Sequence, residues 1–173
     1  MPIHCFAPLA CAASRLLILG SMPGAASLAA GEYYAHPRNA FWPIIDSVFG
    51  VRRDLPYAAR VQGLSAHGIA LWDVLGTCER SGSLDAAIVT ESMIANDFNA
   101  FFTTHPRIER IAFNGAAAER AYRRQVEPQL SVAQRALPSI RLPSTSPAHA
   151  SLTLAGKIER WRAFLLDDIA AGD

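Results

Sequence analysis

Four short apolar runs, each closed by a glycine or a polar residue, constrain the fold of this 173-residue chain more than any other feature. They are RLLILGS (15–21), GIALWDV (68–74), IERIAFNG (108–115) and SIRLPS (139–144). Uninterrupted apolar runs of this length are typical of strands that are buried on both faces, as in a parallel sheet. The sequence therefore predicts four such strands.

Segments with helical spacing separate these runs. Ile44, Ile45, Val48 and Phe49 form one apolar stripe, and Tyr57, Val61 and Leu64 form another. Residues 116–126 and 157–171 are rich in strong helix formers. Strands that alternate with helices indicate βαβ units. We therefore predict an α/β fold, a three-layer α/β/α sandwich around a mostly parallel four-stranded sheet, with residues 1–173 forming a single domain.

Charge and cysteine content limit the possible ligands. The formal net charge is only +1, so any nucleic-acid site must be a local patch, although 15 of the 16 basic residues are arginines, which suit bidentate phosphate or base contacts. Cys5, Cys11 and Cys78 include no CxxC pair. They fit neither a disulfide framework nor a four-thiolate metal site, so no cofactor and no metal are expected.

The same features predict a cytoplasmic setting. Three scattered cysteines suit a reducing compartment. The first basic residue is Arg15, which argues against a signal peptide, and no apolar run approaches 18 residues, so no membrane association is expected. We expect a monomer.

Chemically suggestive residues follow each predicted strand. The segments are GSMPG (20–24), Trp72-Asp73, FNG (113–115) and STSPAHA (144–150). Ligands of open parallel sheets bind beyond the carboxyl ends of the strands. One cleft is therefore expected to collect all four segments.

The aromatic segment YYAHPRNAFW (33–42) has both functional and structural interpretations. Tyr33 and Tyr34 offer ring faces on which a planar ligand can stack, and we expect one of them to be exposed. Phe41 and Trp42 are expected in the core. Asn39 either caps the following helix or faces the cleft, and local signals favour the cap. His36, before a proline, is expected to be hydrogen-bonded scaffold.

The other candidate residues also leave alternatives open. Asp73 ends a buried strand, where a carboxylate serves equally well as a structural acceptor or as a site residue. Asn114 either caps the next helix or faces the cleft. The hydroxyls of the 142–150 loop suit phosphate contacts, but such a loop can also be a solvated turn.

Taken in order, the blocks GSMPG, YYAHPRNAFW, LWDVLGTCERSGSLD, FNG and LPSTSPAHA resemble the uracil-DNA glycosylase superfamily. Within it the chain is most similar to the hypoxanthine-DNA (deoxyinosine) glycosylase branch, and next to the mismatch-specific uracil-DNA glycosylases. The resemblance implies base flipping and base excision repair of DNA that contains deaminated bases, with DNA as the partner.

The resemblance also implies roles for individual residues. Asn39 matches the catalytic amide of the hypoxanthine branch, whereas Met22 stands where mismatch-specific uracil enzymes carry their catalytic Asn. Tyr34 matches the ring that stacks on the flipped base. The base pocket would be completed by the backbone near Ser21 and Met22, by Asp73, where some relatives keep a base-reading Asn, and by Asn114. The DNA-binding loop corresponds to Ser144, Ser146, Pro147, Ala148 and His149.

These roles imply a hydrolytic mechanism without a covalent nucleophile. Asn39 would orient a water molecule at the anomeric carbon of the sugar while the base departs. Lys157, the only lysine, lies far from every motif in sequence, which argues against Schiff-base lyase chemistry and favours a monofunctional enzyme that leaves an abasic site. Asp73 as a carboxylate can accept the base N–H but cannot serve the adjacent carbonyl, so it needs help from the backbone or from Asn114.

Three alternatives remain at this stage. The first is a uracil or mismatch-specific DNA glycosylase, because uracil presents the same N–H and C=O edge. The second is a non-catalytic module that binds nucleotides or damaged DNA. The third is a Ser-His-Asp hydrolase that uses Ser21 or Ser146 with His149 and Asp73, although no GxSxG elbow is present.

Overall fold

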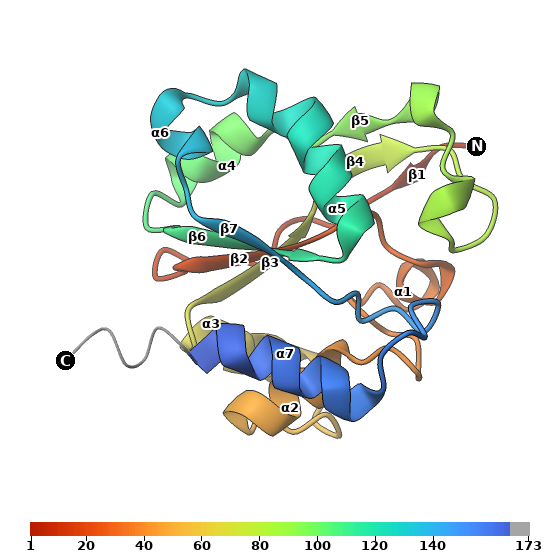
Figure 1. Ribbon diagram of the computed structural model, residues 1–173, viewed down its shortest axis with the longest axis vertical. Helices are drawn as coiled ribbons and strands as arrows, with labels where there is room; N and C mark the ends of the chain where they lie inside the picture. The colour runs from red at the N-terminus through yellow and green to blue at the C-terminus, as the bar shows by residue number, and fades with distance from the viewer. Residues whose placement is uncertain (167–173) are drawn as a thin grey trace.

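A four-stranded parallel sheet forms the centre of the molecule (Figure 1). The computed structural model describes residues 1–166. The strand order is β3-β2-β6-β7, with bounds Ile69–Asp73, Leu16–Gly20, Arg110–Asn114 and Ser139–Leu142. All three strand pairs are parallel. The four predicted strands and the parallel sheet are thus confirmed.

Helices cover both faces of this sheet, which confirms the three-layer prediction (Figure 1). One face carries α2 (Phe41–Phe49), α3 (Tyr57–Ala66) and α7 (Leu154–Leu166). The other carries α4 (Phe98–Thr104), α5 (Ala116–Ala121) and α6 (Val132–Arg135). Strand side chains alternate between the faces, so both layers share the central strand β2.

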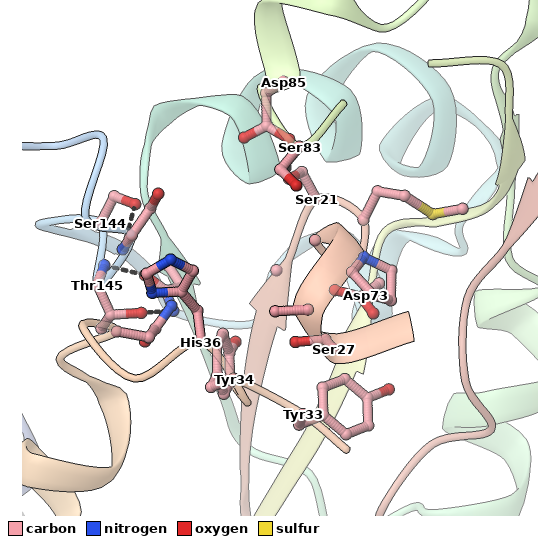
Figure 2. A pocket seen from close by; sticks show the side chains of 18 of the residues that line it. Ser21, Ser27, Tyr33, Tyr34, His36, Asp73, Ser83, Asp85, Ser144 and Thr145 are labelled. Carbon is pink, nitrogen blue, oxygen red and sulfur yellow. Dashed lines mark hydrogen bonds between the residues drawn. The ribbon is translucent and has the colours of Figure 1, made fainter. Parts of the chain in front are cut away.

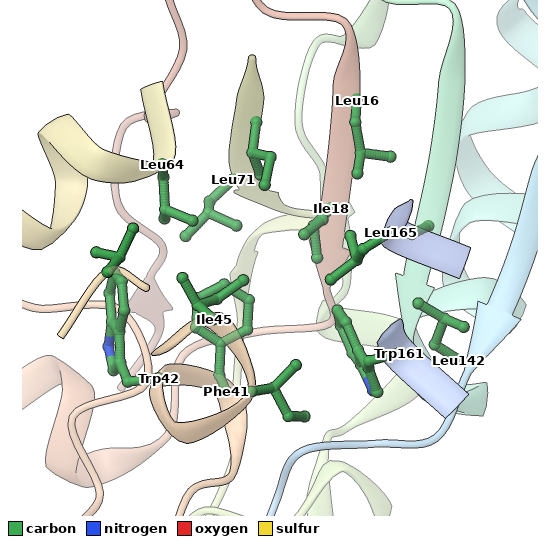
Figure 3. Packing of buried hydrophobic residues seen from close by; sticks show 14 of the residues in the cluster. Leu16, Ile18, Phe41, Trp42, Ile45, Leu64, Leu71, Leu142, Trp161 and Leu165 are labelled. Carbon is green, nitrogen blue, oxygen red and sulfur yellow. The ribbon is translucent and has the colours of Figure 1, made fainter. Parts of the chain in front are cut away.

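Large aromatic rings fill the first of these cores (Figure 3). Phe41 and Trp161 are fully buried and meet edge to face, against Leu16 and Ile18 of β2. Trp42 is 5% exposed. The expected core roles of Phe41 and Trp42 are confirmed, so the polar segment that precedes them is held by a rigid helix.

A second, smaller sheet was not predicted. It is antiparallel with the order β1-β4-β5, and its strands are Ile3–His4, Leu75–Cys78 and Ile94–Ala95. Two of these strands have two residues, which is too short for any periodicity to appear in the sequence. The short helix α1 (Ala25–Ala30) was missed for the same reason.

Two predicted helices differ from expectation in their extent. The predicted helix at 116–126 is an α-helix only over α5 and continues as a π-helical turn, Tyr122–Val126. The predicted helix at 157–171 begins earlier, at Leu154, and its part from 167 to 171 lies outside the described residues. Within residues 1–166 no helix has both the length and the apolar character needed to cross a bilayer.

The strand register brings the four chemically suggestive segments to one edge of the sheet. Gly20 is opposite Asp73 across β2 and β3, and Asn114 is opposite Leu142 across β6 and β7. Because parallel strands all end on the same side, the loops that follow them meet there.

Candidate functional site

A cavity of about 140 Å³ lies at the carboxyl edge of the sheet. All four predicted segments contribute to it, which confirms the expectation of a single cleft (Figure 2). A cavity that holds one water molecule needs only about 10–15 Å³, so this one has room for a small ligand. The lining side chains with polar atoms are Ser21, Ser27, Tyr33, Tyr34, His36, Asn39, Asp73, Ser83, Asp85, Asn114, Ser144, Thr145 and Ser146.

Asp73 is a buried polar group of this cavity. It ends β3, is 3% exposed, and its Oδ2 atom has no hydrogen-bond partner among the described residues. A Cβ atom added to Gly20 would lie 2.5 Å from Asp73 Oδ1 and 3.5 Å from Tyr34 Oη. The carboxyl group therefore occupies the space that a side chain at position 20 would need. A buried acceptor without a partner is costly for folding and marks a site that a ligand can complete.

Burial raises the pKa of Asp73 from 3.8 to about 7, and the negative charge of Asp85 adds to the rise. Arg80 opposes it, but the Arg80 guanidinium donates to the carbonyl oxygens of Pro23 and Gly82 and not to Asp73. The carboxyl group therefore changes protonation state near neutral pH. The neutral form can donate as well as accept a hydrogen bond, which the sequence argument did not consider.

Tyr34 has an unusual backbone conformation. Its φ of 57° is the only positive value at a non-glycine residue in the described chain, and bulky residues rarely adopt it. The ring stacks on Phe41 with centroids 4.2 Å apart, so one face is covered. Its hydroxyl is buried with no hydrogen-bond partner within the geometric limits among residues 1–166, and burial, reinforced by Asp73 and opposed by the nearby Asn114 amide, raises the pKa of the phenol. We expected one of the two tyrosines to be exposed. This expectation is wrong, because Tyr33 is 3% exposed and Tyr34 is half-buried.

Asn39 lines the cavity, and its side chain also bonds to the first residue of α2, whose N-cap is Ala40. Its Oδ1 atom accepts a hydrogen bond from the backbone N–H of Phe41 at 3.0 Å, which fixes the orientation of the amide. The backbone N–H of Asn39 donates to the His36 carbonyl, and the His36 Nδ1 atom accepts from Arg38 N–H. Of the two alternatives that the sequence left open for Asn39, the structure therefore shows the cleft position, together with a hydrogen bond to the first residue of α2, whereas the N-cap is Ala40. His36 has the expected scaffold contacts.

Asn114 pairs with Thr145 through both of its amide atoms. Its Nδ2 atom donates to Thr145 Oγ1 and its Oδ1 atom accepts from Thr145 N–H, each at 2.9 Å. Asn114 does not cap α5, whose N-cap is Gly115. The Thr145 carbonyl in turn accepts from Ala40 N–H at 2.9 Å. These bonds join the end of β6, the 144–150 loop and the residue after Asn39. Base contact by Asn114 stays a prediction.

The 144–150 loop is internally bonded. The Ser144 and Ser146 hydroxyls accept from backbone N–H groups two residues further along, which leaves their own O–H groups free to donate outward. Ser144, Ser146 and Pro147 line the cavity, whereas Ala148 and His149 do not. The His149 ring is within 3.1 Å of the Ser151 hydroxyl.

Lys157 is close to this loop in space, from its place on α7. Its Nζ atom donates to the Ser146 carbonyl at 3.2 Å, and the residue is 5% exposed, so burial lowers its pKa. The premise that Lys157 lies far from every motif is therefore wrong. It is not among the cavity-lining residues, however.

The first turn and the 79–92 segment form the other wall. Met22 is buried against Leu75 and Cys78, so it contributes to the cavity from within the core. The Ser21 hydroxyl donates to Asp85 Oδ1 at 2.6 Å. Ser83 and Asp85 were not predicted as site residues from the sequence. They lie in a polar loop, where nothing local indicates that a hydroxyl or carboxyl group lies beside the cavity.

The contacts do not assemble a Ser-His-Asp triad. Ser21 bonds to Asp85, and His149 lies against Ser151 rather than Ser146. Within residues 1–166, no group of three or more His, Cys, Asp or Glu side chains is placed to hold a metal ion.

Comparisons with known proteins agree on one family. The model of the uracil DNA glycosylase superfamily matches residues 7–169. A hypoxanthine DNA glycosylase of Methanosarcina barkeri is 34% identical over 64% of this chain and 69% of its own length. One from Methanosarcina acetivorans is 35% identical over 61% and 66%. A candidate uracil DNA glycosylase of Methanosarcina acetivorans, solved by solution NMR, has a TM-score of 0.77 and 30% identity, covering 95% of this chain and 97% of its own.

The buried carboxyl group predicts a pH-dependent stability difference for Asp73→Asn. Because the folded-state pKa is raised from 3.8 to about 7, ionisation of Asp73 destabilises the fold progressively between these pH values. A shift of about three units corresponds to a penalty on the order of 4 kcal/mol that is complete above about pH 7.5. The measurement is the free energy of unfolding in denaturant from pH 4 to pH 9. The difference between Asp73→Asn and the unmodified protein should increase in favour of the variant up to about pH 7 and then stay constant. A difference that does not change with pH would contradict the assignment.

Proposed function

Because this chain belongs to the uracil-DNA glycosylase superfamily, we propose that the N-glycosidic bond it hydrolyses in DNA is chiefly that of hypoxanthine. The chain is a DNA glycosylase by family, and two relatives with about one third identity are hypoxanthine DNA glycosylases. We further propose that residues 1–173 act as one catalytic domain. The observation that carries the proposal is the unpartnered Asp73 Oδ2 atom inside a cavity of base size.

We propose that the neutral carboxyl group of Asp73 recognises the lactam edge of the base. Hypoxanthine presents an N1–H donor beside an O6 acceptor, and a carboxylic acid presents an acceptor beside a donor. The two groups form a pair of parallel hydrogen bonds, as a carboxamide would form with the same edge. The neutral Asp73 carboxyl group can therefore donate a hydrogen bond to O6 of the base, which a carboxylate cannot do. The remaining cavity wall, including the backbone at Ser21 and Met22, would enclose the base.

The same proton favours departure of the base. As the C1′–N9 bond breaks, its electron pair goes to the purine, and negative charge accumulates partly on O6. A donor aimed at O6 stabilises this charge, whereas an ionised carboxylate would oppose it. The uncovered face of the Tyr34 ring would hold the base in place by stacking.

Asn39 is proposed to orient the attacking water. One lone pair of its Oδ1 atom accepts a hydrogen bond from Phe41 N–H, and the second would accept a hydrogen bond from water. A lone pair of this water would then be directed at C1′. The C1′–O bond forms as the C1′–N9 bond breaks, and the water gives up one proton to solvent or to the released base. No covalent enzyme intermediate is needed.

The rest of the site would hold extruded DNA. The Ser144 and Ser146 hydroxyls and the loop N–H groups suit phosphate oxygens, and Pro147, Ala148 and His149 would lie along the strand. Lys157 places a positive charge beneath this loop, where it would favour phosphate. Since Lys157 lies outside the cavity, we propose a monofunctional enzyme that leaves an abasic site.

Strand cutting tests this proposal directly. Duplexes that carry one hypoxanthine should be cleaved by alkali after incubation with the protein, whereas undamaged duplexes should not. A uracil duplex measures the alternative, because uracil presents the same lactam edge in a smaller ring. Faster excision of uracil than of hypoxanthine would overturn the purine preference, and lesion binding without cutting would favour a non-catalytic module.

Asn39→Ala should lower the excision rate by at least about 100-fold, because the water is no longer oriented, while lesion binding persists. The substitution also removes the hydrogen bond from Phe41 N–H at the start of α2, worth about 0.5–1.5 kcal/mol. Asn39→Ser is the matched control, since a serine hydroxyl can accept the same hydrogen bond but lacks the amide. Single-turnover excision and gel-shift binding measure both variants. Asn39→Ser retaining more than about a tenth of the rate would argue against a role for the amide.

Excision by the unmodified protein should fall as pH rises through about 7, because the neutral form of Asp73 exists below its raised pKa. Asp73→Asn keeps a donor beside an acceptor and should remain active without this fall. Among the groups near Asp73, Cys5, Tyr33 and Tyr34 stay neutral over this range because burial raises their pKa values, and the charges that act on Asp73 are those of Asp85 and Arg80. Single-turnover rates from pH 5.5 to 9 provide the test. Excision that increases through pH 7 would indicate recognition by the carboxylate instead.

A further inference from the structure

An exposed leucine stands at the rim of the cavity. Leu84 is 58% exposed, and its two chain neighbours, Ser83 and Asp85, both line the cavity. Other large apolar side chains are exposed in the described chain, but none of them has both neighbours in the lining. Single exposed leucines are common and need no explanation by themselves. The position of Leu84, and not its exposure, is therefore the informative observation.

The segment that carries Leu84 is fastened to the first turn on both sides of this residue. Ala25 N–H donates to Ser83 Oγ at 2.9 Å, and the Ser21 hydroxyl donates to Asp85 Oδ1 at 2.6 Å. Figure 2 shows Ser21, Ser83 and Asp85 together at one side of the cavity. Arg80 adds a bond to the Pro23 carbonyl at 2.5 Å.

These bonds hold the backbone of the tip without using the Leu84 side chain. The residues around it, from Ser81 to Ala86, are all exposed. The apolar side chain therefore contributes little to the fold, yet its backbone is fixed beside the opening. A rigid apolar tip of this kind fits a partner that offers an apolar gap at this opening.

Extrusion of a base creates such a gap. When a nucleotide leaves the stack, the flanking base pairs lose their stacking partner at a cost of a few kcal/mol. Apolar side chains that enter base steps replace part of the lost contact. On the opposite wall, the exposed apolar side chains of the 144–150 loop are those of Ala148 and Ala150, which are too short to fill such a gap, and His149 is placed against Ser151.

We propose that Leu84 is a wedge that enters the duplex at the position vacated by the extruded nucleotide. This inference rests on the proposed glycosylase function, and it assigns the wedge to the wall formed by the 79–92 segment. Leu84 is a positioning residue, since it does not reach the reacting atoms. Its contribution is made only where the neighbouring bases are stacked in a duplex.

Leu84→Ala should therefore lower excision from a duplex about tenfold more than excision from the same oligonucleotide as a single strand. Single-turnover rates on hypoxanthine opposite cytosine and on the isolated strand provide this ratio. Leu84→Met should restore most of the ratio, because methionine keeps a long apolar side chain of similar size. Val89→Ala, at a 45% exposed position of the same segment outside the cavity, is the matched control and should leave the ratio unchanged.

A second readout measures extrusion without chemistry. A 2-aminopurine placed beside the lesion becomes more fluorescent when its neighbour leaves the stack, so Asn39→Ala should raise the signal on binding and Asn39→Ala/Leu84→Ala should raise it less. Equal loss on both substrates, or no loss on the duplex, together with an unchanged fluorescence rise, would overturn the wedge. Absence of excision by the unmodified protein on every substrate would instead refute the proposed function.

Discussion

The paired hydrogen bonds between Asn114 and Thr145 hold the candidate site together. They join the end of β6 to the loop after β7, and the Thr145 carbonyl continues the chain of bonds to Ala40, next to Asn39. Three segments distant in sequence thus have one fixed relation. Because an amide that uses both of its polar atoms is restricted in orientation, the loop and Asn39 are positioned before any ligand arrives. Preorganisation of this kind is what a water-orienting amide requires.

Asp73 shows the opposite strategy, in which a polar group remains unsatisfied. Burial without a partner for Oδ2, close to Asp85, raises the pKa of Asp73 to about 7 and reduces folding stability when the group ionises. A buried carboxyl oxygen with a purely structural role normally accepts a hydrogen bond from a nearby donor. The contrast with Asn114, whose amide bonds through both its oxygen and its nitrogen, separates the scaffold of the site from the group left open for a ligand.

The sequence predicted the parallel sheet because its four strands are long, apolar and clearly bounded. It did not predict β1 or β5, because two-residue strands have no periodicity and depend on pairing with β4. The convergence of the four loops followed from strand direction alone. The roles within the cleft did not, since the Asn114–Thr145 pair spans 31 residues and no local pattern specifies such a partner. Burial of Lys157 under the loop was missed for the same reason.

Asn39 shows why a local argument and a functional argument need not compete. A bond to the start of α2 and a place in the cavity looked like alternatives when only neighbouring residues were considered. In the fold, the hydrogen bond from Phe41 N–H uses one lone pair of Oδ1 and thereby fixes where the second one points. The helix behind it is anchored by Phe41, which packs on Trp161 and stacks with Tyr34. In the proposed mechanism, core packing therefore sets the direction from which water approaches the sugar, and the bond from Phe41 N–H is a condition for catalysis.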